Sequence, residues 1–160
     1  MDSILKYFNG EKAQCTIGLL VAIVFILVAG YFLWLQNPVL KGVAYVTLLV
    51  SVLLGSICAG VVWRTPKDIA RVSSFYQSAP EKMRTEELPR MKKVMSSFSI
   101  IKKVEIVLVA AGVLMFFFFG KNDLLRGIGI GLVAMGSLGF LFDHLAEARG
   151  KIYFDFLKKL

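Results

Sequence analysis

The sequence contains few of the residues from which catalytic and metal sites are built. Its 160 residues include one histidine and two cysteines, Cys15 and Cys58. The cysteines form no Cys-x-x-Cys pair, which argues against thiol exchange and favours a role as buried small apolar side chains. No serine stands in a recognisable nucleophile motif, and no glycine loop has the spacing of a phosphate cradle. We therefore expect neither enzymatic activity nor a cofactor.

Charged residues are also missing from the middle of four long apolar blocks. Hydrophobic residues make up 57% of the chain, and the mean hydropathy is +0.70. The blocks cover residues 13–35, 39–63, 104–120 and 124–144, and each is near or above the ~17–25 residues that a helix needs to cross a bilayer. Runs this long and continuous exclude the alternating strands of a membrane barrel. The sequence predicts an all-α membrane protein with four transmembrane helices.

Basic residues are scarce on one predicted side of the membrane. The two short turns and the adjoining ends of the blocks, which form this side, carry only Lys41, Lys121 and Arg126. The other side holds both chain ends and residues 64–103, which alone contain ten lysines and arginines. The positive-inside rule places this side in the cytoplasm, as expected for a bacterial inner membrane. Anionic headgroups account for the net charge of +8, and nucleic-acid binding is not expected because no reader module is present.

The chain shows an internal repeat at an offset of 85 residues. The sequence QNPVLKGV at residues 36–43 reappears as KNDLLRGI at residues 121–128, and Arg64 aligns with Arg149. Each copy lies between two apolar blocks, so we interpret the chain as two tandem hairpins. The predicted units are a first hairpin (1–63), a cytoplasmic loop (64–103), a second hairpin (104–146) and an interfacial tail (147–160).

Small residues recur every fourth position in the second and fourth blocks, a spacing that lets helix backbones approach closely. These two blocks correspond in the repeat and are predicted to pack as the inner pair. We expect Gly55→Leu and Gly131→Leu to disturb the bundle more than Gly18→Leu. The predicted packing residues are Gly55, Ala59, Gly60, Gly127, Gly131 and Gly136.

The loop at residues 64–103 contains two amphipathic helical patterns. The first is predicted to begin with Thr65 as N-cap and Pro66 in the first turn. The second continues into the third block without a helix breaker. The two patterns could fold together, lie on the headgroups, or bind another protein. The residues predicted to form this partner or membrane surface are Phe75, Tyr76, Met91, Met95, Phe98, Lys102 and Lys103.

Four ionisable residues gather near the cytoplasmic ends of blocks three and four: Glu105, Asp143, His144 and Glu147. Such a set could ligate a divalent metal or relay protons. No two-helix Glu-x-x-His motif accompanies them, so a rim of ion pairs with Lys102, Lys103, Arg64 or Arg149 is the favoured interpretation.

The sequence predicts a non-enzymatic inner-membrane protein that acts by protein–protein interaction in the bilayer. Its partner would be a membrane complex of which it is an accessory subunit, or a membrane-targeting toxin against which it serves as an immunity-type protein. A homo-oligomer also fits. A small oligomeric channel or transporter is the first alternative, and a membrane enzyme that uses the four-residue rim is the second.

Overall fold

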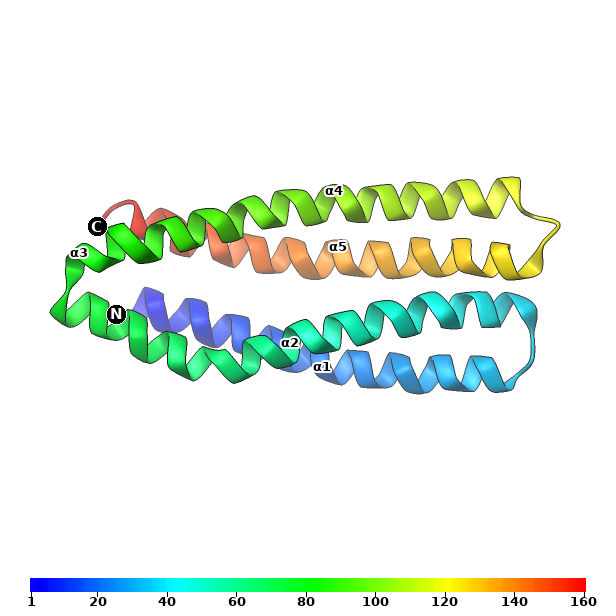
Figure 1. The fold of residues 1–160 in the computed structure, drawn as a ribbon, viewed down its shortest axis with the longest axis horizontal. Helices are drawn as coiled ribbons and strands as arrows, with labels where there is room; N and C mark the ends of the chain where they lie inside the picture. Colours follow the sequence, from blue (N-terminus) through cyan, green and yellow to red (C-terminus); the bar gives the residue numbers. More distant parts are fainter.

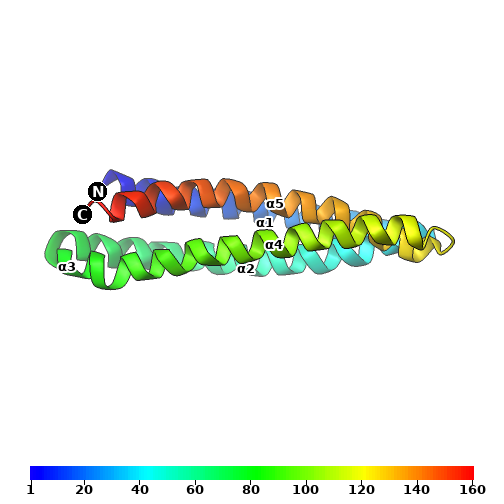
Figure 2. The ribbon, with the colours of Figure 1, turned by 90° about the horizontal axis from the view of Figure 1, so that it is seen from above.

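The computed structural model describes residues 1–160 as four long helices that run side by side (Figures 1 and 2). The fold contains no strand, which confirms the all-α prediction. Both chain ends lie at the same end of the molecule as the short α3 (Figure 1). The elements are α1 (Asp2–Trp34), α2 (Pro38–Ser78), α3 (Pro80–Lys82), a π-helical turn η1 (Met83–Glu87), α4 (Leu88–Phe118) and α5 (Asp123–Leu157).

The two turns that close the hairpins use the same helix cap. Asn37 Oδ1 accepts hydrogen bonds from the amides of residues 39 and 40 at 2.9 and 3.3 Å. Asn122 Oδ1 accepts them from residues 124 and 125 at 3.1 and 3.2 Å. A side-chain oxygen in this position satisfies amides that the first helical turn leaves free. The two caps are 85 residues apart, which is the repeat offset.

Three helices are long and apolar enough to cross a membrane: α1, α2 and α5. These helices indicate an integral membrane protein. Helix α4 is not among the three, because Lys102, Lys103 and Glu105 interrupt its apolar part and leave 13 uncharged residues, 106–118, before the helix ends. Composition and length therefore do not establish α4, the third span predicted from sequence, as a membrane-crossing helix.

Helices α2 and α5 form the contact that joins the two hairpins. Helix α4 packs along α5, and only its first turn reaches the first hairpin, where Arg90 lies over the ring of Phe8. The α2–α5 contact is reciprocal: a Cβ on Gly42 would collide with the backbone of Leu124, and one on Gly127 with the backbone of Val39. Residues 39 and 124 are themselves repeat equivalents. Contacts of this kind are expected from a twofold arrangement of equal halves.

Close helix packing depends on glycines that the sequence pattern identified only in part. Gly131 and Gly136 lie against neighbouring helices, where an added Cβ would stand 3.0 Å from Val46 and 2.9 Å from Val109, respectively. Gly112 of α4 and Gly129 of α5 face one another, and a Cβ on either would stand 2.7 Å from the other's carbonyl oxygen. The small-every-fourth pattern did not single out this α4–α5 crossing.

The predicted packing role is wrong for Gly60, where a Cβ would meet no atom within 4 Å. Ala59 is likewise exposed. A Cβ on Gly55 would stand 3.7 Å from Ala22, which is ordinary van der Waals contact. A Cβ on Gly18 would stand 2.9 Å from Cys58 and 3.1 Å from Phe142, so Gly18 is confined. The reason is rotational: residues 56, 59 and 60 lie on an exposed side of α2, turned away from its contact with α5.

The predicted helix start at Thr65 is also wrong, because α2 continues through it to Ser78. Thr65 Oγ1 instead donates to the Val61 carbonyl at 2.6 Å. Pro66 lies inside the helix, where its missing N–H leaves the carbonyl of Val62 without a helical donor. Helices α2, α4 and α5 thus pass through the unit boundaries that the apolar blocks indicated.

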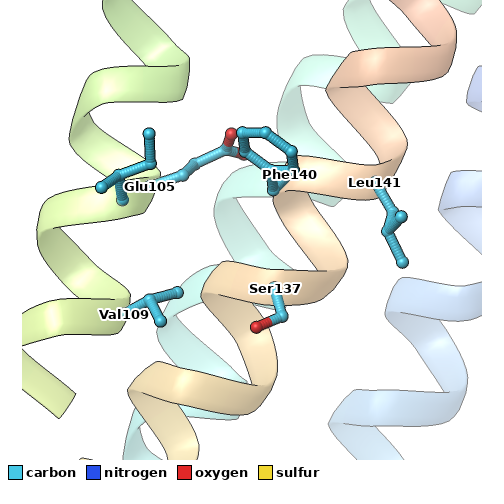
Figure 3. A pocket seen from close by; sticks show the side chains of 6 residues that line it. Glu105, Val109, Ser137, Phe140 and Leu141 are labelled. Atoms are coloured by element: carbon cyan, nitrogen blue, oxygen red, sulfur yellow. The ribbon is translucent and has the colours of Figure 1, made fainter. Parts of the chain in front are cut away.

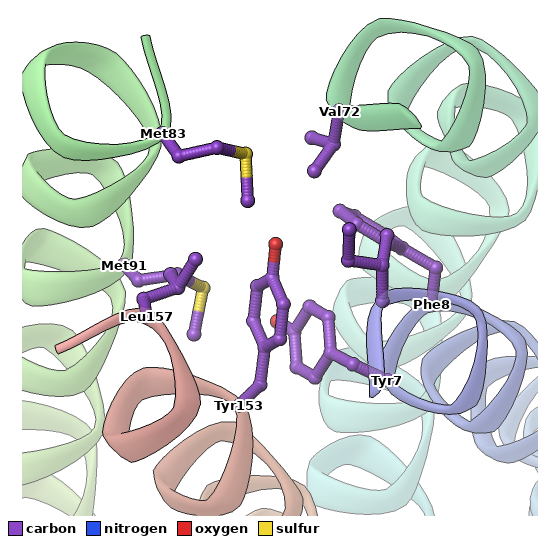
Figure 4. Close-up of a cluster of buried hydrophobic side chains, with 8 residues drawn as sticks. Tyr7, Phe8, Val72, Met83, Met91, Tyr153 and Leu157 are labelled. Atoms are coloured by element: carbon purple, nitrogen blue, oxygen red, sulfur yellow. The ribbon is translucent and has the colours of Figure 1, made fainter. Parts of the chain in front are cut away.

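A hydrophobic cluster at the end of the molecule that holds both termini packs the loop against the chain ends (Figure 4). The segments predicted to be separate tails and loop helices therefore fold together, and α1 and α5 extend beyond their apolar stretches to take part. Phe75 and Val94 pack on the cluster from the two amphipathic patterns. The cluster residues are Ile4, Tyr7, Phe8, Val72, Met83, Met91, Tyr153 and Leu157.

The spacing around the glycines predicts the order of two substitutions. Gly18→Leu should destabilise the protein by about 1–3 kcal/mol, the usual cost of forcing extra volume into a packed site, because Cys58 and Phe142 leave no room. Gly55→Leu should cost less. Unfolding in mixed detergent micelles, followed by circular dichroism, measures both, and a larger loss for Gly55→Leu would contradict the assigned packing.

Candidate functional site

The most deeply buried charge lies beside the hydrophobic cluster that packs the loop against the chain ends. Glu87 is 1% exposed and accepts hydrogen bonds from Arg90 Nε at 2.8 Å and Nη2 at 2.6 Å. The hydroxyl of Tyr153 donates to it at 3.1 Å, and Arg71 lies 4.0 Å away. A paired and hydrogen-bonded carboxylate of this kind is costly to disrupt, because removal of one partner leaves the other charge buried.

The surroundings of Glu87 change the acidity of both partners. Burial lowers the pKa of the Arg90 guanidinium, but the hydrogen bonds and charge of Glu87 outweigh this and raise it above its ordinary value. Burial, followed by the charge of Glu87, raises the pKa of Tyr153. Arg90 stays charged and Tyr153 stays protonated at every physiological pH, so these residues have no proton to transfer near neutral pH. Together with Glu87 they connect η1, α4 and α5.

The four ionisable residues of the predicted rim make different contacts in the structure, and the charges of Asp143 and Glu105 act on one another. Glu147 pairs with Lys102, and His144 is exposed and stacks on Phe140 with an angle of 3° between the rings. The chain holds no group of three or more His, Cys, Asp and Glu residues arranged to bind a metal ion. The Lys102–Glu147 pair is one of the ion pairs that the favoured interpretation allows, whereas Glu105 forms no ion pair within the chain.

A groove between α4 and α5 contains Glu105 (Figure 3). Glu105 is 8% exposed, and its Oε2 is buried with no hydrogen-bond partner. Gly139 provides the room, because a Cβ there would stand 2.8 Å from Glu105 Oε1. The groove has a volume of about 430 Å³ and is lined by Glu105, Ile106, Val109, Ser137, Phe140 and Leu141. We call it the α4–α5 groove.

A second groove of about 360 Å³ lies between α1 and α2. Ser51 lies at its base with 0% exposure, and its hydroxyl has no hydrogen-bond partner. We call it the α1–α2 groove; its lining residues are Leu19, Ala22, Ile23, Ile26, Ser51, Val52, Gly55, Ser56 and Ala59.

One edge of the α1–α2 groove continues into an outward stripe of small residues on α2. Ser56, Ala59 and Gly60 are exposed, and Trp63 at the end of the stripe is 80% exposed. Their spacing of three and four residues places them on one helix face. We call these four residues the α2 stripe. Ala59 and Gly60, which were predicted from sequence to pack inside the bundle, thus face outward.

The predicted partner surface is divided between buried and exposed positions. Met91 is fully buried in the hydrophobic cluster, which corrects its assignment to a surface. Met95 and Phe98 lie against Gly150, at 3.3 and 3.8 Å from the position that a Cβ would take there. Tyr76 and Lys103 remain exposed. The apolar faces of the two loop segments pack in one hydrophobic cluster, and residues from both chain ends complete that cluster.

Sequence patterns missed Glu87, Tyr153 and Ser51 as buried polar positions. Glu87 stood among exposed loop residues and Tyr153 in a tail, and no local pattern indicates that they meet across 66 positions of chain. A signal did exist for Ser51, one of the few polar residues in an apolar block. No protein-family model matches the chain, and neither a curated protein nor a solved structure shows significant similarity to it.

The hydrogen bond from Tyr153 to Glu87 predicts a measurable stability difference. Tyr153→Phe keeps the stacked ring and should lower the free energy of unfolding by about 1.5–3 kcal/mol, the range for a hydrogen bond to a charged group. Tyr7→Phe is the control, since the Tyr7 ring stacks on Tyr153 at 4.5 Å but its hydroxyl makes no hydrogen bond within the chain. Equal losses in the two variants, measured by chemical unfolding in micelles, would assign the effect to packing alone.

Proposed function

We propose that this chain is a non-enzymatic membrane protein that binds a transmembrane helix of another membrane protein. The α2 stripe is the observation that carries the proposal. Small residues at this spacing permit close backbone approach between helices in lipid, and within the chain nothing occupies the space beside Gly60.

The proposal places α4 in the bilayer as a fourth span. Its residues 106–118 run beside α5, and Phe117 and Phe118 are highly exposed, as lipid-facing side chains would be. Lys102 and Lys103 have stems long enough to place their ammonium groups among the headgroups. The excess of lysine and arginine at the end that holds both termini favours a cytoplasmic location for that end, in a bacterial inner membrane.

We also propose that the two hairpins arose by duplication. The equivalent caps at Asn37 and Asn122 and the reciprocal contacts of Gly42 and Gly127 support this. A duplicated pair uses one self-complementary surface to join its halves, which leaves the opposite face of α2 free for a partner.

Two biological forms fit a helix-binding protein of this kind. An accessory subunit would hold its partner helix permanently, as part of a membrane complex. An immunity-type protein would bind a helix only when a toxin inserts into the bilayer. Both forms need the same surface, so one pair of variants tests them together.

Gly60→Leu should abolish partner binding and leave the fold intact, because the new side chain enters open space on the proposed interface. Gly30→Leu is a matched control: it also adds a leucine to an exposed position with nothing within 4 Å, but on α1. A photoreactive amino acid at Ile57 reports the partner by cross-linking in intact membranes. The proposal requires one cross-linked membrane protein that Gly60→Leu removes and Gly30→Leu keeps.

Equal cross-linking in the two leucine variants would contradict the assigned surface. A cross-link to a second copy of this chain, sensitive to Gly60→Leu, would replace the hetero-partner with a homodimer.

The channel alternative makes a different prediction. Thr47 and Ser51, the polar residues in the middle of α2, are buried in the bundle. We expect liposomes that contain the purified protein to show the ion conductance of empty liposomes in voltage-clamped bilayer recordings. Voltage-dependent or saturable conductance that scales with protein content would refute the interaction proposal.

A further inference from the structure

The carboxylate of Glu105 lacks a hydrogen-bond donor for one oxygen although it is almost fully buried. Oε2 has no partner within the chain. Lys102, one turn before it on α4, is paired with Glu147 of α5. Buried polar atoms in native proteins nearly always have a partner, and Oε1, which also accepts no hydrogen bond within the chain but is not closed off like Oε2, is the oxygen that a donor from the groove can reach.

The surroundings of Glu105 restrict the shape of that donor. Apolar side chains form most of the lining of the α4–α5 groove, and the high exposure of the lining residues Ile106 and Leu141 marks its mouth. With α4 in the bilayer, as proposed above, this mouth faces the hydrocarbon of the cytoplasmic leaflet. The occupant therefore has an apolar tail in the groove and an N–H donor at the level of Glu105.

We propose that the α4–α5 groove binds a glycerophospholipid whose headgroup ends in a primary ammonium, such as phosphatidylethanolamine. The ammonium donates to Glu105, and one acyl chain lies along Ile106, Val109 and Leu141. A quaternary ammonium has no N–H and leaves the oxygen unpaired, so phosphatidylcholine binds more weakly. Charge-assisted hydrogen bonds are the stronger kind, which makes this single contact sufficient for selectivity.

Other charges beside the site are consistent with a zwitterionic headgroup. Lys103 is exposed and lies three residues before Ile106, on the cytoplasmic side of the groove. An exposed lysine at this end of α4 can attract a lipid phosphate. Free ethanolamine has no tail and gains nothing from the apolar lining, so the groove selects the lipid and not the soluble amine.

Native mass spectrometry of the protein released from nanodiscs tests this inference. The nanodiscs contain phosphatidylethanolamine and phosphatidylcholine with identical acyl chains in equal amounts. The wild-type protein should retain the primary-amine lipid about tenfold more than the choline lipid, a difference equal to one charge-assisted hydrogen bond. Added free ethanolamine should not displace it.

Glu105→Gln should reduce this preference to about twofold or less, since a neutral amide loses the charge that strengthens the bond. Asp123→Asn, in the first turn of α5 at the other end of that helix, should preserve it. Ser137→Phe fills the groove from an exposed position and should displace both lipids, which guards against misinterpretation if the Gln variant is unstable. Gly60→Leu should preserve the lipid preference, so failure of the helix-binding proposal remains distinguishable.

Equal retention of the two lipids by the wild type would overturn the inference. It would also fall if Glu105→Gln kept the preference, if Asp123→Asn lost it equally, or if Ser137→Phe retained the lipid.

Discussion

The backbone contact between α2 and α5 at Gly42 and Gly127 is the constraint on which the rest of the bundle depends. Each glycine lies against the backbone of the opposite helix, and no side chain larger than hydrogen fits at either position. Because α4 packs along its length on α5, this contact also decides where most of α4 lies. In lipid, where apolar association gains little, such close van der Waals packing is a main source of helix association.

The opposite end of the molecule is held by different physics. There the chain ends and the loop enclose a hydrophobic cluster around the Glu87–Arg90 pair, in a region that water can surround. Tyr153 links α5 to that pair across the cluster. The protein is thus fixed at one end by glycine-mediated helix contact and at the other by burial of apolar area, and between them lie two open grooves that contain unpaired polar atoms.

The proposed functions use what these two constraints leave unused. The α2 stripe faces outward because the α2–α5 contact occupies a different side of α2. Gly139 makes space for Glu105 beside the α4–α5 groove. Lys102, one turn before Glu105, pairs with Glu147, so Glu105 is left without an ion-pair partner. A helix and a lipid are the partners that a bilayer supplies for surfaces of these two kinds.

Hydropathy and repeat spacing alone determined the helical class, the hairpin turns at Asn37 and Asn122, and the pairing of the second apolar block with the fourth, because these follow from local composition and period. The side of α2 that packs was decided only in the tertiary structure: Gly18 proved confined and Gly60 free. Local patterns give the spacing of small residues but not the rotation of the helix about its axis. That rotation, like the meeting of Glu87 with Tyr153, is set by contacts between segments distant in sequence.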